Sequence, residues 1–276
     1  MLLESNPAVL VTFKGRPGVG KGTLAKKVIG LFLEDSNYAT SIAPGDLIRD
    51  TKREGSSAPL HAIFSPYYDR MKKGELLPDG VMAIAMRQAI IKEKSEGARI
   101  IFLDGYPRNK VQARDMAQIS GELIDAATIS SHHYVEIHAP QKEAIRRIET
   151  RVAQDLAIGN PVRDDDLDPN VRLNRQRIFN KHTLRLSYQL AARGDLIKID
   201  GTQVIDDVYK DMLLRVIGPY FKGEPIISDP PSFRARIRHT LYEIMEAAER
   251  TNEAVKKATS FRRITNTIAV AASLHD

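Results

Sequence analysis

The chain has 276 residues, 42% hydrophobic and 28% charged, which suits one large globular α/β domain with an extension. It contains no cysteine, so disulfides and thiolate zinc sites are excluded. No apolar run is long enough to span a membrane and no secretory signal opens the chain, so we expect a cytoplasmic protein without membrane association. The net charge of +6 comes without a stripe of basic and aromatic residues. We therefore expect no nucleic-acid partner, and attribute the charge to solvated helix faces and to arginines gathered in one cleft.

The first expected element is a buried strand at residues 8–14, followed directly by the segment GRPGVGKGT at residues 15–23. A strand, a glycine-rich turn with a lysine, and then a helix are typical of a phosphate-binding loop. Its glycines let successive backbone N–H groups point at an anion, and the helix that begins near Lys21 adds its positive dipole end. Lys21 supplies a mobile charge and Thr23 a hydroxyl for magnesium. The sequence therefore predicts a nucleoside triphosphate site.

Short apolar runs predict further strands at residues 38–43, 99–103, 132–137 and 196–200. Helices are expected at residues 21–34, 45–53, 60–73, 79–96, 110–118, 141–156, 169–193 and 204–216. This alternation predicts an open, parallel, five-stranded sheet of the P-loop NTPase type, with helices on both faces and ligands at the carboxyl ends of the strands.

A second constellation, Asp104-Gly105-Tyr106-Pro107-Arg108, follows the third expected strand. An aspartate at a strand end that faces the phosphate loop can hold magnesium through water. Arg108 can reach a second, accepting phosphate. Together with the loop at residues 15–23, this segment predicts phosphoryl transfer.

The amino-acid composition changes at Gly218, where glycines and prolines predict a linker over residues 218–232. Beyond it we expect a helical extension over residues 233–276, with an amphipathic helix at 234–257 and a shorter one at about 260–273. Because an isolated helix of this length is marginal in water, its apolar face needs a partner. We expect the extension to be structural or to mediate self-association, outside the chemistry.

Together these segments resemble the nucleoside monophosphate kinases, and among them most closely the adenylate kinases. The family's GxPGxGKGT is Gly15 to Thr23, with Leu24 where glutamine is usual, and its DG(F/Y)PR is intact at residues 104–108. Its (S/T)GDxLR segment matches residues 44–49, with Pro44 in first place, and G-(K/E)-x-V-x-D matches residues 74–79. The resemblance covers residues 8 to about 216 and implies a kinase domain over residues 1–217.

The resemblance also implies an ATP lid. Residues 147–151 resemble the family's RxxGR, with Thr150 replacing the glycine, and residues 162–166 resemble the segment that closes the lid. An ungapped comparison back from residues 198–201 places Arg175 at the second closing arginine, with one residue inserted and Arg172 as the alternative. The lid is of the short type without a zinc cluster, so the expected cofactor is Mg²⁺ and not zinc.

The resemblance implies the following site residues. ATP would contact Gly18, Val19, Gly20, Lys21, Gly22, Thr23, Arg147, Arg151 and Gln203. The monophosphate would contact Pro44, Gly45, Arg49, Glu75, Leu76, Leu77, Gly105, Tyr106, Arg108, Gln112, Arg163 and Arg175. Catalysis would depend on Lys21, Arg108, Arg151, Arg163 and Arg175, and magnesium would lie near Thr23 and Asp104, largely through water. Two segments would move, a monophosphate lid at about 45–78 and the ATP lid at about 152–166.

The acceptor is AMP in our preferred interpretation, because the amide of Gln112 can both donate to and accept from adenine. Pro44 departs from the threonine of adenylate kinases, so CMP, UMP or another monophosphate stays open. A different class is also open: the substitutions at Leu24, Pro44 and Thr150 allow a nucleotide-binding regulator with weak catalysis. The retained Lys21 and the full set of arginines argue against it, since a pure binder needs no acceptor-side or lid arginines.

Overall fold

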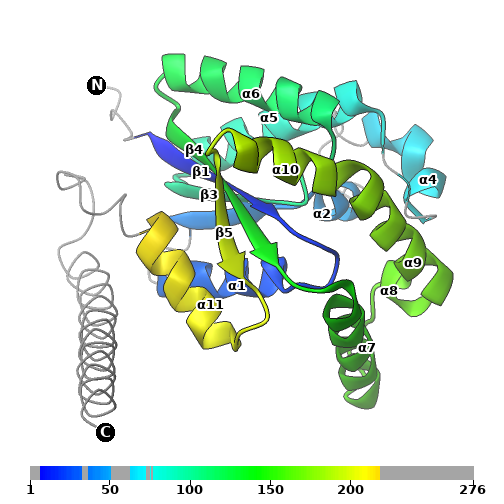
Figure 1. Ribbon diagram of the computed structural model, residues 1–276. Helices are drawn as coiled ribbons and strands as arrows, with labels where there is room; N and C mark the ends of the chain where they lie inside the picture. Colours follow the sequence, from blue (N-terminus) through cyan, green and yellow to red (C-terminus); the bar gives the residue numbers. More distant parts are fainter. Residues whose placement is uncertain (1–6, 33–36, 51–62, 73–74, 76, 218–276) are drawn as a thin grey trace, which may run out of the picture. The chain divides into compact units, whose positions relative to one another are not determined.

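The computed structural model describes residues 7–32, 37–50, 63–72, 75 and 77–217, as drawn in colour in Figure 1. The chain divides into two compact units, residues 1–212 and 213–276, and of the second unit the described part is Leu213–Ile217. The linker, the predicted amphipathic helix at 234–257 and its expected self-association fall outside the described residues. In the part that is described, no helix has both the length and the hydrophobicity needed to cross a membrane.

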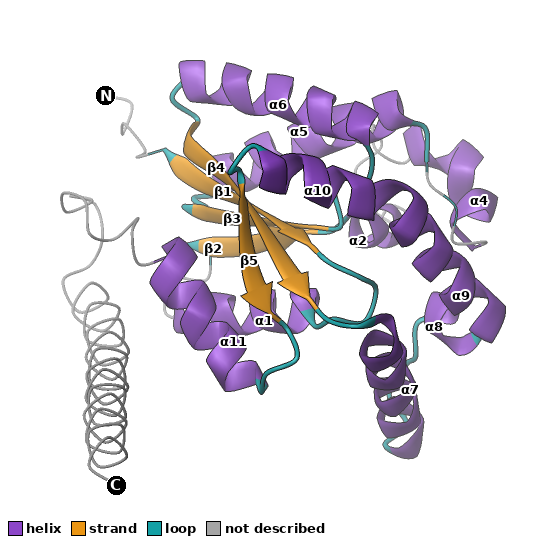
Figure 2. Ribbon diagram, viewed as in Figure 1, coloured by secondary structure: helices purple, strands orange, loops and turns teal. Residues whose placement is uncertain are grey.

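Five parallel strands form one sheet in the order β2-β3-β1-β4-β5 (Figure 2). They are β1 (Ala8–Lys14), β2 (Ala39–Ile42), β3 (Ile100–Asp104), β4 (Ile129–His138) and β5 (Leu196–Asp200). The predicted five-stranded parallel sheet is confirmed, and each strand lies at the expected place in the chain. β4 begins three residues earlier than expected, because Ile129 to Ser131 extend the pairing with β1.

Helices cover both faces of the sheet, α5, α6 and α10 on one side and α1 and α11 on the other (Figure 1). The first half of the chain forms α1 (Lys21–Ile29), the 3₁₀ turn η1 (Gly30–Phe32), α2 (Pro44–Asp50), the 3₁₀ turn η2 (Ser65–Tyr67), α4 (Tyr68–Lys72), α5 (Asp79–Ser95) and α6 (Lys110–Asp125). The second half forms α7 (Gln141–Ala157), α8 (Asp164–Leu167), α9 (Pro169–Ile178), the π-helical turn η3 (Phe179–Thr183), α10 (Leu184–Ala192), α11 (Ile205–Met212) and the π-helical turn η4 (Leu213–Ile217).

The central strand β1 is buried on both faces, which explains its unbroken apolar pattern. Because side chains alternate along a strand, Ala8 and Leu10 join the core under α5 and α6, while Phe13 points to the opposite face. Phe13 stacks on Phe102 of β3 with ring centroids 5.1 Å apart. Leu24, which stands where the family has glutamine, is fully buried in α1 and strengthens the core by about 1.5–3 kcal/mol.

The expected helix at 169–193 is interrupted by the π-helical turn η3 between α9 and α10. Hydrophobic periodicity cannot detect this turn, because it adds one residue without breaking the helical run. The first helix is also shorter than expected and continues as η1, and α7 includes the first residues of the proposed ATP lid.

Candidate active site

Glycines shape the phosphate loop between β1 and α1 because other chain segments approach it closely. Gly15, Gly18 and Gly20 have φ values of 138°, 93° and 97°, a region that favours glycine. A Cβ on Gly18 would lie 2.2 Å from the Ala144 carbonyl oxygen, and one on Gly15 would lie 2.4 Å from the Ile137 oxygen. Gly201, which follows β5, meets the same stretch, since its Cβ would lie 2.6 Å from Ile137 Cγ2. The loop geometry is therefore fixed by backbone contact with the end of β4 and the first turn of α7.

Lys21 opens α1 and its side chain is 13% exposed. Its Nζ donates to the carbonyl oxygens of Gly15 (3.1 Å) and Arg16 (3.2 Å) and lies 3.8 Å from Asp104 Oδ1. Burial lowers the pKa of Lys21; the Asp104 carboxylate opposes this shift, and the cationic side chains of Arg108, Arg175 and Arg163 add to it. Three arginine charges thus act on Lys21, and a bound anion of high charge would relieve this repulsion.

Asp104 and Thr23 offer the oxygen atoms that suit magnesium. Asp104 ends β3, and its Oδ2 would lie 3.5 Å from a Cβ on Gly22, so the carboxylate faces the first turn of α1. Thr23 is exposed in that same turn. A hydroxyl and a carboxylate beside a phosphate site fit a magnesium ion that keeps most of its water. Over residues 7–217, as far as they are described, no group of three or more His, Asp or Glu side chains is placed to hold a metal by itself.

Residues 105–109 are called the acceptor loop here, after the predicted role of Arg108. The backbone of Arg108 is held from outside this loop. The Arg108 N–H donates to Gln112 Oε1 (2.8 Å), and the Arg108 carbonyl accepts from Thr183 Oγ1 (2.9 Å) in η3. Its side-chain Nε donates to the Gly105 carbonyl (2.6 Å). Burial, and next the nearby charge of Arg175, lowers the pKa of Arg108.

Gln112 is buried in the first turn of α6, where it takes part in this support. Its Nε2 donates to Asp79 Oδ1 (2.9 Å), which also accepts from Asn109 Nδ2 (2.8 Å). The Asn109 Oδ1 caps α6 by accepting from the Gln112 N–H (2.9 Å). The Gln112 amide has one more N–H and one more lone pair than these contacts use, so it can still meet a base edge.

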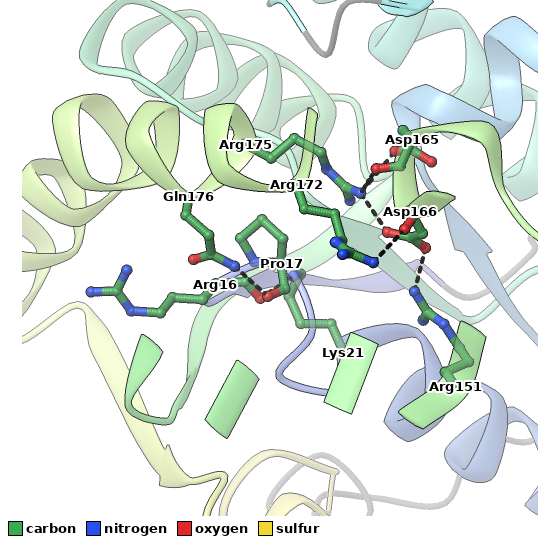
Figure 3. Close-up of polar contacts among 9 residues, drawn as sticks. All are labelled: Arg16, Pro17, Lys21, Arg151, Asp165, Asp166, Arg172, Arg175 and Gln176. Carbon is green, nitrogen blue, oxygen red and sulfur yellow. Dashed lines mark hydrogen bonds and ion pairs between the residues drawn. The ribbon is translucent and has the colours of Figure 1, made fainter. Parts of the chain in front are cut away.

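The lid arginines meet around Asp166, as Figure 3 shows. This carboxylate is 1% exposed, is ion-paired with Arg151, and accepts from Arg175 Nη1 at 2.7 Å. Arg175 Nη1 also lies 2.9 Å from Asp165 Oδ2. Arg172 instead donates to the backbone oxygen of Asp166 (3.0 Å) and approaches Glu149 at 3.9 Å.

Arg163 is exposed at the N-cap of α8. The charges of both Arg163 and Arg175 help to lower the pKa of Lys21.

Arg147 and Gln203 are the two remaining residues that the resemblance assigns to ATP binding, and they lie in different parts of the structure. Arg147 donates from Nη1 to the Val19 carbonyl (3.3 Å) and from Nε to Glu143 Oε1 (2.7 Å), so it borders the phosphate loop. Gln203 is exposed in the turn after β5.

On the monophosphate side, Pro44 is the first residue of α2, a position that favours proline because its missing N–H is not needed there. Gly45 follows it in α2. Leu77 and Tyr106 are buried, and Glu75 is paired with Arg70 at 3.2 Å. Leu76 and the side chain of Arg49 lie outside what the structure describes.

Several supporting residues were missed by sequence reasoning. Arg16 donates to Asn180 Oδ1 (2.5 Å) and Gln141 Oε1 (3.4 Å), and its guanidinium lies 4.9 Å from the Phe179 ring centroid. Gln176 Nε2 donates to the Pro17 carbonyl (3.0 Å), a contact drawn in Figure 3. The sequence offered one signal for these contacts, namely that Arg16 occupies the variable second position of the phosphate-loop motif. The segment around η3 therefore touches both the phosphate loop and Arg108.

Comparisons with known proteins agree with this geometry. A family model described as adenylate kinase matches residues 13–224. An adenylate kinase of Methylobacterium radiotolerans is 31% identical, covering 75% of this chain and 94% of that protein. An adenylate kinase of Deinococcus radiodurans is 32% identical over 74% of this chain and 94% of its own length. One of Methanosarcina barkeri is 30% identical over 72% and 94%.

Proposed function

Because this chain belongs to the adenylate kinase family of nucleoside monophosphate kinases, we propose that the site described above transfers the terminal phosphoryl group of ATP to AMP. The bond between the γ-phosphorus and its bridging oxygen breaks, and a bond forms from that phosphorus to an oxygen of the AMP phosphate. The products are two ADP, and the reaction is reversible. The observation that carries this proposal is the Lys21 ammonium group, which the carbonyls of Gly15 and Arg16 hold 3.8 Å from the Asp104 carboxylate.

Transfer between two phosphates needs positioning and charge neutralisation more than acid–base help. The backbone amides of residues 18–23 cradle the donor phosphates, and Lys21 leaves the loop carbonyls to follow the phosphoryl group. Arg108, with Arg49 from α2, holds the acceptor phosphate. Arg151, Arg163 and Arg175 neutralise the charge that spreads over the transferred group.

Magnesium is the cofactor that the family generally uses with ATP, and the oxygen atoms of Thr23 and Asp104 fit it. When bound, this ion neutralises phosphate charge and orients the donor. Asp104 also opposes the fall in the pKa of Lys21.

The two nucleosides bind on opposite sides of the transferred group. The ATP base lies along Arg147 and Gln203. The monophosphate lies against Pro44, Gly45, Glu75, Leu76, Leu77, Gly105 and Tyr106, and the edge of its base meets Gln112. The segments at about 45–78 and 152–166 close over the nucleotides and exclude water, because water in the site would hydrolyse ATP.

A panel of monophosphates tests this proposal. The full chain is mixed with Mg-ATP and AMP, CMP, UMP or GMP, and diphosphates are separated by ion-exchange chromatography. We expect ADP formation with AMP to exceed that with every other acceptor. A higher turnover with CMP or UMP would replace AMP as the acceptor, and no diphosphate with any of them would favour a nucleotide-binding regulator.

The role of Gln112 has its own control. We expect Gln112→Ala to raise KM for AMP about tenfold, the effect of one lost hydrogen bond, while KM for ATP stays nearly constant. Asn109→Ala removes a second contact to the same Asp79 oxygen, together with the helix cap, without touching the base edge. If both variants raise KM for AMP equally, Gln112 supports the loop and does not read adenine.

A further inference from the structure

Lys14 is a buried charge that the reaction above does not use. It is the last residue of β1, directly before the phosphate loop, and its side chain is 2% exposed. It lies on the same face of the strand as Thr12, because side chains alternate along a strand. Burying an ammonium group costs desolvation free energy, so a lysine at this place needs a polar partner.

The partner is the acceptor loop. Lys14 Nζ donates to the Pro107 carbonyl at 3.3 Å. That carbonyl belongs to the peptide group whose N–H is that of Arg108. The N–H donates to Gln112 Oε1 and the next carbonyl accepts from Thr183 Oγ1. Lys14 therefore supplies the one contact among these that comes from the strand carrying the phosphate loop.

The surrounding charges permit this contact. Glu136 of β4, itself 4% exposed, pairs in register with Lys14 and opposes the loss of its proton. Lys21 of α1 acts in the other direction, and Glu136 also acts on Arg16 of the phosphate loop. Burial is the largest cause and lowers the pKa of Lys14 to about 7. Either protonation state can hold Pro107, because a neutral amine still donates hydrogen bonds.

We propose that Lys14 is a positioning residue, which fixes the Pro107 carbonyl and so sets the place of Arg108 relative to the phosphate loop. The inference rests on the proposed function, because it assigns Arg108 to the acceptor phosphate. Lys14 touches no nucleotide in this scheme. Its hydrogen bond to Pro107 connects the strand that carries the phosphate loop to the acceptor loop.

The test measures equilibrium binding of AMP and of ATP to the full chain by calorimetry. We expect Lys14→Met to weaken AMP binding by about tenfold, the effect of roughly one hydrogen bond, and to change ATP binding by less than about twofold. Thr12→Val is the matched control: it removes a buried contact of the same strand face, from Thr12 Oγ1 to His132 Nε2 at 2.8 Å. We expect it to leave the ratio of the two affinities unchanged.

A double-mutant cycle separates positioning from general damage. If Lys14 acts through Arg108, then Lys14→Met adds little to the loss of AMP affinity caused by Arg108→Ala. Losses that simply add, or equal losses for ATP and AMP, would overturn the inference. Should Lys14→Met not fold by circular dichroism, Lys14→Leu, which also removes the donor to Pro107, takes its place with the same expectations.

Failure of the proposed reaction is a separate result. A wild-type chain that binds AMP but makes no ADP would overturn the catalytic proposal and leave the binding test of Lys14 intact. A wild-type chain that binds no AMP would overturn both.

Discussion

The phosphate loop and the lid arm, defined as residues 151–175, hold their charges by different means. Lys21 of the loop is held by backbone carbonyls, in a turn whose shape depends on glycines pressed against neighbouring backbone. The lid arm instead holds its arginines through two side-chain carboxylates, Asp165 and Asp166. The loop is thus defined by main-chain geometry and the arm by ion pairs. Substitutions should therefore act on shape in the first region and on charge balance in the second.

The largest effect is expected from Lys21→Met, which removes the one lysine that the loop holds by its carbonyls. We expect kcat to fall by about 10²–10³-fold, since the lost charge acts on the transferred group. The fold should keep its stability, because burial already disfavours this ammonium group. Steady-state kinetics and thermal unfolding measure the two effects. Lys26→Met, an exposed lysine in the same helix, should leave kcat near the wild-type value.

The next effect concerns the shape of the loop. Gly18→Ala should destabilise the protein by several kcal/mol, because its Cβ would lie 2.2 Å from the Ala144 oxygen in addition to the strained φ. Gly20→Ala meets nothing within 4 Å and should cost only the backbone strain, about 1–2 kcal/mol. Urea unfolding compares the two variants. Equal losses would show that close backbone contact does not set this loop.

In the lid arm, the charge of Asp166 should matter more than that of Asp165. Asp166→Asn leaves Arg151 and Arg175 without their shared buried carboxylate, and we expect a loss of about 1–3 kcal/mol. Asp165 is 29% exposed, so Asp165→Asn should cost about 1 kcal/mol or less. Urea unfolding at low salt measures both, and a larger loss for Asp165→Asn would contradict this account of the arm.

The last effect is a change of stability with pH. The pKa of Lys14 is about 7 in the folded protein and 10.5 as its ordinary value, so between these values the unfolded chain binds more protons. Its contribution therefore makes the free energy of unfolding rise with pH, by at most about 1.4 kcal/mol per pH unit. Urea unfolding of wild type and Lys14→Met from pH 6.5 to 9.5 should show a stability difference that shifts toward the wild type as pH increases. Parallel profiles would mean that Lys14 stays charged.

The fold could be predicted from the sequence because its signals are local. Buried strands read as apolar runs, and the segment at residues 15–23 identifies its own strand–loop–helix context, so the sheet and the family assignment are confirmed. The roles of the individual site residues stay predictions.

The supporting contacts could not be predicted, because they join residues far apart in the chain. Lys14 and Pro107 are 93 residues apart, and Gln176 and Pro17 are 159 apart. No pattern along the sequence encodes such pairs. The π-helical turn at Phe179–Thr183 was missed for a related reason, since it changes the direction of side chains without changing the local composition.

Some glycines of this chain can be replaced and others cannot, as those packed against the end of β4 and the start of α7 show. A Cβ on Gly15, Gly18 or Gly201 would clash with the backbone of residues 137–144. A library for directed evolution should therefore leave all three unchanged. Gly121 is different, because it lies inside α6 and a Cβ there meets nothing within 4 Å. Alanine at this position would add about 0.8–1 kcal/mol of helix propensity. The stability of the enzyme can therefore be increased by substitution outside its phosphate loop.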